Sequence, residues 1–481
     1  MTILVIDAGT SGIRALLVED DGRVHAERSA ELLPDSPAAG LVEFDAARYA
    51  ATAIRLATDL LEESGRDVDA VGISNQRAST IVWDRQTGEP VAPAQGWQDL
   101  RTIGECLALM AEGHPVAPNQ SATKAADIWN AVDPDRTRDL CIGTPDTWLI
   151  WCLTEGRSHL TDASNSAVTG LSKAGTPVWD PHVLSRLRIP EASLPRIVDS
   201  IGHFGDATAL PGAPPILGVA GDQQASLIGQ GCVEPGLTKV TFGTGGMLDM
   251  CLGPDAPGAA RRSPGGTFPI VCWQQDGIAT WGIEAIMLSA GTNVQWLRDD
   301  LGVIATSADS ADVAAGCDST EGVVYVPAQL GLGTPKWDYG ARGALFGLTR
   351  GSTRAHVVRA VLEGVAQRGA DLVDAAEADA SVRIESLRID GGMSENPVFR
   401  QALADATQRV VEVAPMKEAT GLGAAYLAGL CLGTWGSWSD IAASWRPTGR
   451  TEPGRPLDRA KWADAVERAA RWHPDLSSLD F

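Results

Sequence analysis

Short apolar runs separated by turn residues dominate the start of the chain. Residues 2–6 form an apolar run typical of a buried strand, and after a turn at residues 8–12 the pattern resumes over residues 14–18. A second turn at residues 20–22 leads into a third strand. The pattern therefore predicts that a strand hairpin opens the protein.

Helical patterns follow at wider spacing. Asp45 is placed to cap a helix that runs to about Ser64, where Gly65 ends it. Residues 144–154 are apolar and rich in Trp, which predicts a buried helix, and residues 355–376 predict a long amphipathic helix. Near the C-terminus, a run of small residues predicts a helix that packs closely against a neighbour.

The second half of the chain opens much as the first half does. Residues 239–242 read as a strand, and a glycine turn follows at residues 243–246. The residues themselves show no strict repeat. Because 481 residues are too many for one ordinary core, we expect two domains, at 1–230 and 231–481, with the boundary near residues 226–235.

The net charge of the chain argues against nucleic acid as a partner. The chain carries 61 acidic and 39 basic residues, a formal net charge of −22. A protein that binds nucleic acid needs a basic footprint, which this composition lacks. We interpret the excess acid as a solvated surface. The excess of acidic residues favours a neutral substrate over an anionic one. We expect Mg²⁺ to screen the phosphates of any nucleotide.

Cysteine use and hydropathy predict a cytoplasmic protein. None of the eight cysteines forms a Cys-x-x-Cys pair, and most lie among apolar residues. We expect small buried side chains with reduced thiols. The chain begins directly with a strand pattern, without a basic leader, and no apolar run approaches membrane-spanning length. We expect no membrane partner.

Two glycine-rich turns are candidates for binding phosphate. The first follows Asp7 and contains Thr10 and Ser11, with Arg14 just beyond it. Backbone amides and hydroxyls in such a turn can hold phosphate oxygens, and a carboxylate at the strand end can meet Mg²⁺ through water. The second turn contains Thr244. Each pattern alone is also compatible with an ordinary turn.

Two later motifs each allow a functional and a structural interpretation. Asp222, at the end of a strand, could take a proton from a substrate hydroxyl or could simply cap the helix that follows. Gly392 follows another strand, where a missing side chain lets a flat base approach. Asn396 could bind adenine, cap the next helix, or do both.

Missing motifs argue against three other kinds of enzyme. The chain has no Gly-x-x-x-x-Gly-Lys-Ser/Thr loop of a P-loop kinase and no Gly-x-Gly-x-x-Gly of a dinucleotide-binding oxidoreductase after the first strand. It also has no Gly-x-Ser-x-Gly nucleophile elbow. Its seven histidines are scattered, and His356 suits a helix start better than a catalytic site.

A resemblance to the FGGY carbohydrate kinases rests on longer motifs. The segments GALFGL (residues 343–348) and HVVRAVLE (356–363) match an FGGY signature at every constrained position. Within that family, GISNQR (72–77), GDQQA (221–225) and GLGAAYLAG (421–429) are similar to glycerol kinases. The resemblance implies an α/β protein with two actin-like (ribonuclease H-like) domains and an interdomain cleft. It also implies a homodimer or homotetramer.

The resemblance implies a role for each matching position. Asp222 is similar to the general base, and Asp7 and Asp222 would face Mg²⁺. The positions that resemble acceptor contacts are Arg77, Ala78, Trp97, Asn119, Asp222, Gln223 and Met247. The positions that resemble contacts to ATP phosphates or nucleoside are Thr10, Ser11, Arg14, Thr244, Gly291, Gln295, Gly392 and Asn396.

Three departures from the glycerol kinase pattern fall in one pocket. Ala78 stands in place of a Glu that hydrogen-bonds glycerol, Asn119 in place of a Tyr, and Met247 in place of an aromatic residue. The pocket loses an acceptor and gains volume. We therefore expect an ATP-dependent kinase for a polyol or sugar larger than glycerol. A true glycerol kinase and a non-catalytic nucleotide-binding module of the same fold are the alternatives.

Overall fold

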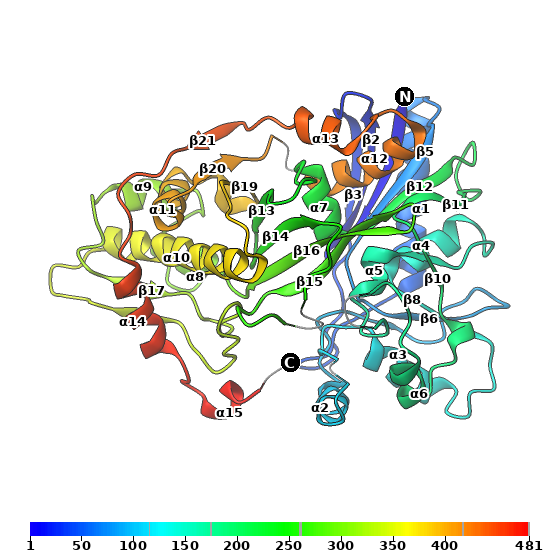
Figure 1. The fold of residues 1–481 in the computed structure, drawn as a ribbon, viewed down its shortest axis with the longest axis horizontal. Helices are drawn as coiled ribbons and strands as arrows, with labels where there is room; N and C mark the ends of the chain where they lie inside the picture. The colour runs from blue at the N-terminus through cyan, green and yellow to red at the C-terminus, as the bar shows by residue number, and fades with distance from the viewer. Residues whose placement is uncertain (115, 174–175, 259–261, 416–417, 480–481) are drawn as a thin grey trace.

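The computed structural model describes residues 1–114, 116–173, 176–258, 262–415 and 418–479. Two β-sheets, each covered by helices, lie side by side and together account for both halves of the chain (Figure 1). The α/β class and the two-domain organisation predicted from the sequence are therefore confirmed.

The first sheet has six strands in the order β11-β12-β5-β1-β2-β3. β1 pairs antiparallel with β2, which pairs antiparallel with β3, so the predicted opening hairpin is confirmed. β5 and β12 continue the sheet in parallel, and β11 closes it antiparallel. Its strands are β1 (Thr2–Ala8), β2 (Gly12–Glu19), β3 (Val24–Glu31), β5 (Ala70–Asn75), β11 (Ile201–Asp206) and β12 (Pro215–Gly221).

The second sheet repeats this topology strand for strand. β13 is antiparallel to β14 and parallel to β19, as β1 is to β2 and β5. β16, β20 and β21 then take the places of β3, β12 and β11, and β15 is an additional edge strand. The strands are β13 (Thr238–Phe242), β14 (Gly246–Gly253), β15 (Phe268–Gln275), β16 (Ile278–Met287), β19 (Ser386–Asp390), β20 (Val410–Val413) and β21 (Gly449–Thr451). The fold is thus duplicated although the residues show no strict repeat.

Each sheet buries one face against a long helix. α1 (Ala46–Ser64) covers the first sheet. The Asp45 side chain accepts a hydrogen bond from the Arg48 backbone N–H at 2.9 Å, and Gly65 ends the helix in the left-handed conformation, both as predicted. α10 (Arg354–Ala380) covers the second sheet and begins with a capping box formed by Thr353 and His356, which confirms the helix-start interpretation of that histidine.

The opposite faces of the two sheets meet across α7 (Asp222–Gly229) and α12 (Ala419–Leu432). Glycines bring these helices into backbone contact: a Cβ at Gly423 would lie 1.8 Å from the Ala225 carbonyl oxygen. The small-residue helix predicted near the C-terminus is therefore confirmed as a close-packing element. Although α12 lies between β20 and β21 of the second sheet in sequence, it packs on β1, β5 and β12 of the first sheet.

A long insertion between β5 and β11 carries the buried Trp-rich helix α4 (Pro145–Leu153), as predicted. Its other elements are β6 (Ile81–Asp84), β7 (Ala94–Gln95), α2 (Ile103–Ala111), α3 (Ala122–Val132), β8 (Leu140–Gly143), β9 (Leu160–Asp162), α5 (Ala163–Ala167), α6 (Pro181–Leu187) and β10 (Arg196–Val198). Besides α10, the helices of the second domain include α8 (Thr292–Asp299), α9 (Asp309–Ala315), α11 (Pro397–Thr407) and α14 (Arg459–Ala469).

All eight cysteines are free thiols, and five of them are buried, so they act mainly as small core side chains. Among the described residues, no helix is both long enough and apolar enough to cross a membrane.

Candidate active site

The two glycine turns occupy equivalent places in the two sheets. The first joins β1 to β2 and the second joins β13 to β14. Ser11 and Thr244 are exposed and Thr10 is half-buried, so these turns are open at the surface. Gly291, at the start of α8, donates its backbone N–H to the Gly243 carbonyl oxygen at 2.8 Å and brings that helix end to the second turn.

Asp7 lies at the end of β1 between two partners that are in register with it. Arg14 on β2 donates from Nη2 to Asp7 Oδ2 at 2.7 Å, and Ser74 on β5 donates from Oγ to Oδ1 at 2.8 Å. Arg14 also contacts the Glu418 carboxylate. Asp7 is therefore fixed in orientation by two hydrogen bonds, while the predicted phosphate contact of Arg14 stays a prediction.

Asp222 is the first residue of α7, not its cap. Gly221 holds the N-cap position, and the Asp222 Oδ1 atom accepts from the Gln223 backbone N–H at 2.8 Å. The capping interpretation of Asp222 is therefore wrong. Burial raises the pKa of the Asp222 carboxyl, whereas the Arg77 guanidinium, whose Nε lies 3.5 Å from Oδ1, acts in the opposite direction. A carboxylate with a raised pKa is a better proton acceptor.

Arg77 connects this carboxylate to the second domain. Its Nη2 donates to Oε2 of Glu284 on β16 at 2.7 Å. Burial raises the pKa of the Glu284 carboxyl, as does neighbouring Asp249, while the Arg77 charge opposes both. Arg77 thus pairs with one carboxylate from each domain.

Three charged residues at this junction were not predicted from the sequence. Lys239 on β13, Asp249 on β14 and Glu284 on β16 lie opposite one another in register, and all three are buried. Each interrupts an apolar strand pattern, which is the signal that singles them out. Their proximity depends on strand pairing, which local patterns do not reveal.

The predicted acceptor residues come from separate segments in both halves of the chain. The Trp97 indole N–H donates to Thr10 Oγ1 at 3.1 Å, which connects this predicted acceptor residue to the first turn, and 39% of Trp97 remains exposed. Ala78 is buried and Met247 is half-buried. Asn119 is exposed, in a loop whose neighbouring carbonyl at Gln120 accepts from Lys124 Nζ at 3.0 Å.

The predicted nucleoside contacts lie on the second domain. Gln295 is exposed on α8. A Cβ added at Gly392 would meet no atom within 4 Å, so space is open beside it. Asn396 caps α11, where its Oδ1 accepts from the backbone N–H groups of Val398 and Phe399, which confirms the capping interpretation. A further contact of Asn396 with adenine stays a prediction.

Asp7 and Asp222 fit a magnesium ion that enters with nucleotide phosphates. Among the described residues, no group of three or more His, Cys, Asp or Glu side chains is placed to hold a metal alone. Mg²⁺ on a nucleotide needs only one or two carboxylates and keeps several waters. Burial is the main cause of the raised pKa of the Asp222 carboxyl, and the nearby Asp7 charge is a smaller cause in the same direction. The two carboxylates therefore influence each other.

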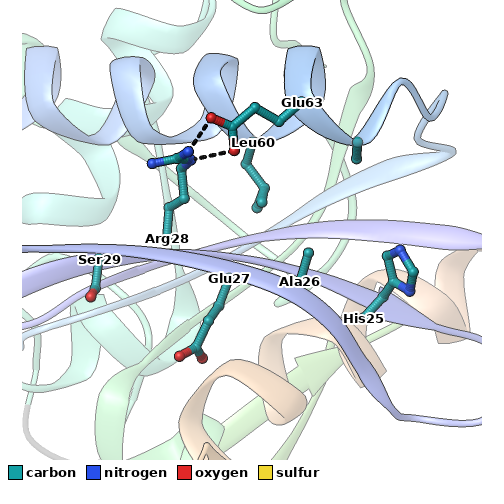
Figure 2. A pocket seen from close by; sticks show the side chains of 8 residues that line it. His25, Ala26, Glu27, Arg28, Ser29, Leu60 and Glu63 are labelled. Atoms are coloured by element: carbon teal, nitrogen blue, oxygen red, sulfur yellow. Dashed lines mark hydrogen bonds and ion pairs between the residues drawn. The ribbon is translucent and has the colours of Figure 1, made fainter.

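A separate depression of 640 Å³ lies between β3 and α1 (Figure 2). Arg28 and Glu63 form an ion pair across it. It contains none of the predicted site residues, because α1 packs on the face of the first sheet opposite α7 and α12.

Comparisons with known proteins show the family to which both halves of the chain belong. Residues 2–229 match the N-terminal domain, and residues 239–432 the C-terminal domain, of the FGGY family of carbohydrate kinases. The chain is 41% identical to a glycerol kinase of Aromatoleum aromaticum, with 98% of this chain and 99% of that protein covered. It is 39% identical to a glycerol kinase of Rhodopirellula baltica, with 99% and 92% covered.

Among solved structures, the fold is similar to that of Plasmodium falciparum glycerol kinase with ADP. The TM-score is 0.91 at 28% identity, with 97% of this chain and 98% of that chain covered. The similarity therefore extends over both sheets and the junction between them.

Proposed function

Because the chain belongs to the FGGY family of carbohydrate kinases, we propose that it transfers the γ-phosphoryl group of Mg-ATP to a hydroxyl of a small polyol or sugar, with Asp222 as the general base. The observation that carries this assignment is the state of Asp222. It is not engaged as a helix cap, its pKa is raised by burial, and Arg77 lies beside it.

Each part of the site has a distinct task in this reaction. Asp222 accepts the proton of the attacking hydroxyl, so the acceptor oxygen gains nucleophilic character as the phosphoryl group moves. Arg77 donates hydrogen bonds near that oxygen and orients the acceptor. The turns at Thr10 and Thr244 offer hydroxyls and amides to the phosphates. Mg²⁺, when bound near Asp7 and Asp222, neutralises charge on the transferring group.

The nucleotide is proposed to lie mainly on the second domain. The open space beside Gly392 and the junction of Gly291 with the second turn support this placement. We propose that the acceptor lies mainly on the first domain, between Arg77 and Trp97. The division at residues 230 and 231, the cytoplasmic location and a homo-oligomeric state stay predictions.

For the acceptor, we propose a four- or five-carbon polyol or sugar. The proposal rests on Ala78, Asn119 and Met247, which replace three glycerol-binding side chains in the related pattern. Glycerol is the second candidate, because the relatives that cover nearly the whole chain carry the name glycerol kinase. The retained base and its ion pairs argue against a non-catalytic module.

An acceptor panel tests this proposal. ADP release is measured with ATP, Mg²⁺ and glycerol, tetritols, pentitols or ketopentoses. A higher kcat/KM for a four- or five-carbon acceptor is the expected result. If glycerol is preferred by tenfold or more, about 1.4 kcal/mol of transition-state binding, the larger acceptor is rejected and glycerol is the substrate. If no acceptor of the panel supports ADP release, the kinase assignment is rejected for this acceptor class.

A further inference from the structure

One face of the second sheet carries charged residues toward the first domain. On β13, β14 and β16, the alternate residues Val240, Leu248 and Ile283 belong to the core under α10. Because side chains alternate across a strand, their neighbours Lys239, Asp249 and Glu284 project from the other face, toward α7. Met247 shares this face with Asp249, two residues along β14, so the charged row continues the wall assigned to the acceptor.

Lys239 donates two hydrogen bonds and forms one ion pair within the protein. Its Nζ lies 2.7 Å from Asp249 Oδ2, and it donates to Gln223 Oε1 at 2.7 Å and to Thr241 Oγ1 at 3.1 Å. An ammonium group carries protons and no acceptor, so toward each of these partners it can act only as a donor or a cation. The Lys239 and Asp249 side chains are both fully buried, and each compensates the charge of the other.

This contact decides which way the Gln223 amide faces. An ammonium can only donate, so the amide oxygen must point to Lys239 and the amide NH₂ must point away from it. Gln223 is half-buried and directly follows Asp222. Within the part of the chain that the structure describes, no side chain or backbone group takes a hydrogen bond from this NH₂.

We propose that Lys239, held by Asp249, is a positioning residue that turns the Gln223 amide into a hydrogen-bond donor for the acceptor, an inference that rests on the proposed kinase function. Arg77, whose Nε lies 3.5 Å from Asp222 Oδ1, is also only a donor. Beside the base, the site therefore offers two donors. These two donors suit a substrate that has a hydrogen-bond-accepting oxygen next to the reacting hydroxyl. Either a second hydroxyl or a ketose carbonyl supplies such an oxygen.

The test removes the ion pair as a unit. Lys239→Met/Asp249→Leu leaves no lone buried charge, which protects folding. We expect the KM of the preferred acceptor to rise about tenfold, the effect of one lost hydrogen bond, with kcat within about threefold and the KM of ATP unchanged. Gln223→Glu keeps an oxygen toward Lys239 but has no NH₂, so it should raise the acceptor KM by a similar factor.

A coupling measurement separates positioning from a general effect on the site. If Lys239 acts through Gln223, adding Gln223→Ala to the double variant should raise the acceptor KM no further than Gln223→Ala alone. Arg388→Met is the matched control: Arg388 lies next to Lys239 in register on β19 but contacts the Gln230 carbonyl instead of Gln223. It should leave the acceptor KM unchanged.

Three results would overturn the positioning role: a wild-type acceptor KM in the double variant, a wild-type KM in Gln223→Glu, or independent, multiplicative effects in the triple variant. These outcomes are distinct from failure of the proposed function. If the proposed function fails, the wild-type enzyme releases no ADP with any acceptor. If only the positioning role fails, the wild-type enzyme is active and the variants alone contradict the inference.

Discussion

Arg77 and Glu284 form an ion pair of 2.7 Å that joins the end of β5 in the first domain to β16 in the second. The same guanidinium lies 3.5 Å from Asp222. The proposed base, Asp222, is therefore paired with a residue that also contacts the second domain, and the proposed acceptor site draws on both sheets.

We predict that Arg77→Met lowers kcat/KM for the acceptor by roughly 10- to 100-fold, because hydrogen bonds to charged groups contribute about 1.5–3 kcal/mol. It leaves Glu284 buried without its cation, so the variant Arg77→Met/Glu284→Leu should recover thermal stability but not activity. Steady-state kinetics and thermal unfolding measure the two effects. Recovery of activity in the double variant would show that Arg77 serves stability alone.

The nucleoside site predicts contrasting effects at adjacent glycines. Gly392→Leu should fold normally, since open space surrounds the position, and should raise the ATP KM roughly tenfold, about 1.4 kcal/mol. Gly391→Ala should instead destabilise the protein, because Gly391 has φ +83° and a Cβ there would lie 2.4 Å from the Phe242 carbonyl oxygen. An unchanged ATP KM in a folded Gly392→Leu variant would move the adenine site elsewhere.

Acceptor choice can be tested at Ala78. We expect Ala78→Glu to raise kcat/KM for glycerol relative to a five-carbon acceptor by roughly tenfold, because a regained hydrogen bond to a charged group contributes about 1.5 kcal/mol or more. Ala78→Gln adds the same volume without the charge and is the control. Equal effects of Glu and Gln would assign the change to volume, and no effect of either would remove Ala78 from the specificity-determining residues.

Stability should depend on pH through Asp146 at the start of α4. Burial raises the pKa of this carboxyl from 3.8 to about 6, and its oxygens accept from Thr144 and Thr161. Between these values the folded protein binds a proton that the unfolded chain has released, so stability decreases as pH rises toward 6 and stays lower above it.

The Asp146→Asn substitution should remove this dependence. Relative to wild type, the free energy of unfolding of Asp146→Asn should increase by up to about 3 kcal/mol between pH 4 and pH 8. Urea unfolding at the two pH values measures it. A difference between wild type and variant that is the same at both pH values would contradict the raised pKa.

Local signals predicted the elements well, and the site in part. Asp45 and Gly65 mark the ends of α1 because capping is decided by a few neighbouring residues. The strand-end positions of Asp7 and Asp222 are equally local. By contrast, whether Asp222 caps its helix could not be decided from its neighbours, and the structure excludes the capping role.

What the sequence could not predict depends on register and on long-range packing. Lys239 and Glu284 lie on the same row only because β13, β14 and β16 pair in one register, and a shift by one residue would place them on opposite faces. The packing of α12 on the first sheet likewise joins segments far apart in the chain, such as Gly72 and Ala424.

Replacement of Asp222 tests the central claim most directly. Phosphoryl transfer to the best acceptor is measured for wild type, for Asp222→Asn and for Asp206→Asn, an exposed aspartate on β11 of the first sheet, with nucleotide binding measured in parallel. We predict that Asp222→Asn loses about 10²–10⁴-fold in kcat while it still binds ATP, and that Asp206→Asn matches wild type. An Asp222→Asn enzyme that keeps more than about a tenth of wild-type turnover would contradict the assignment of Asp222 as the general base.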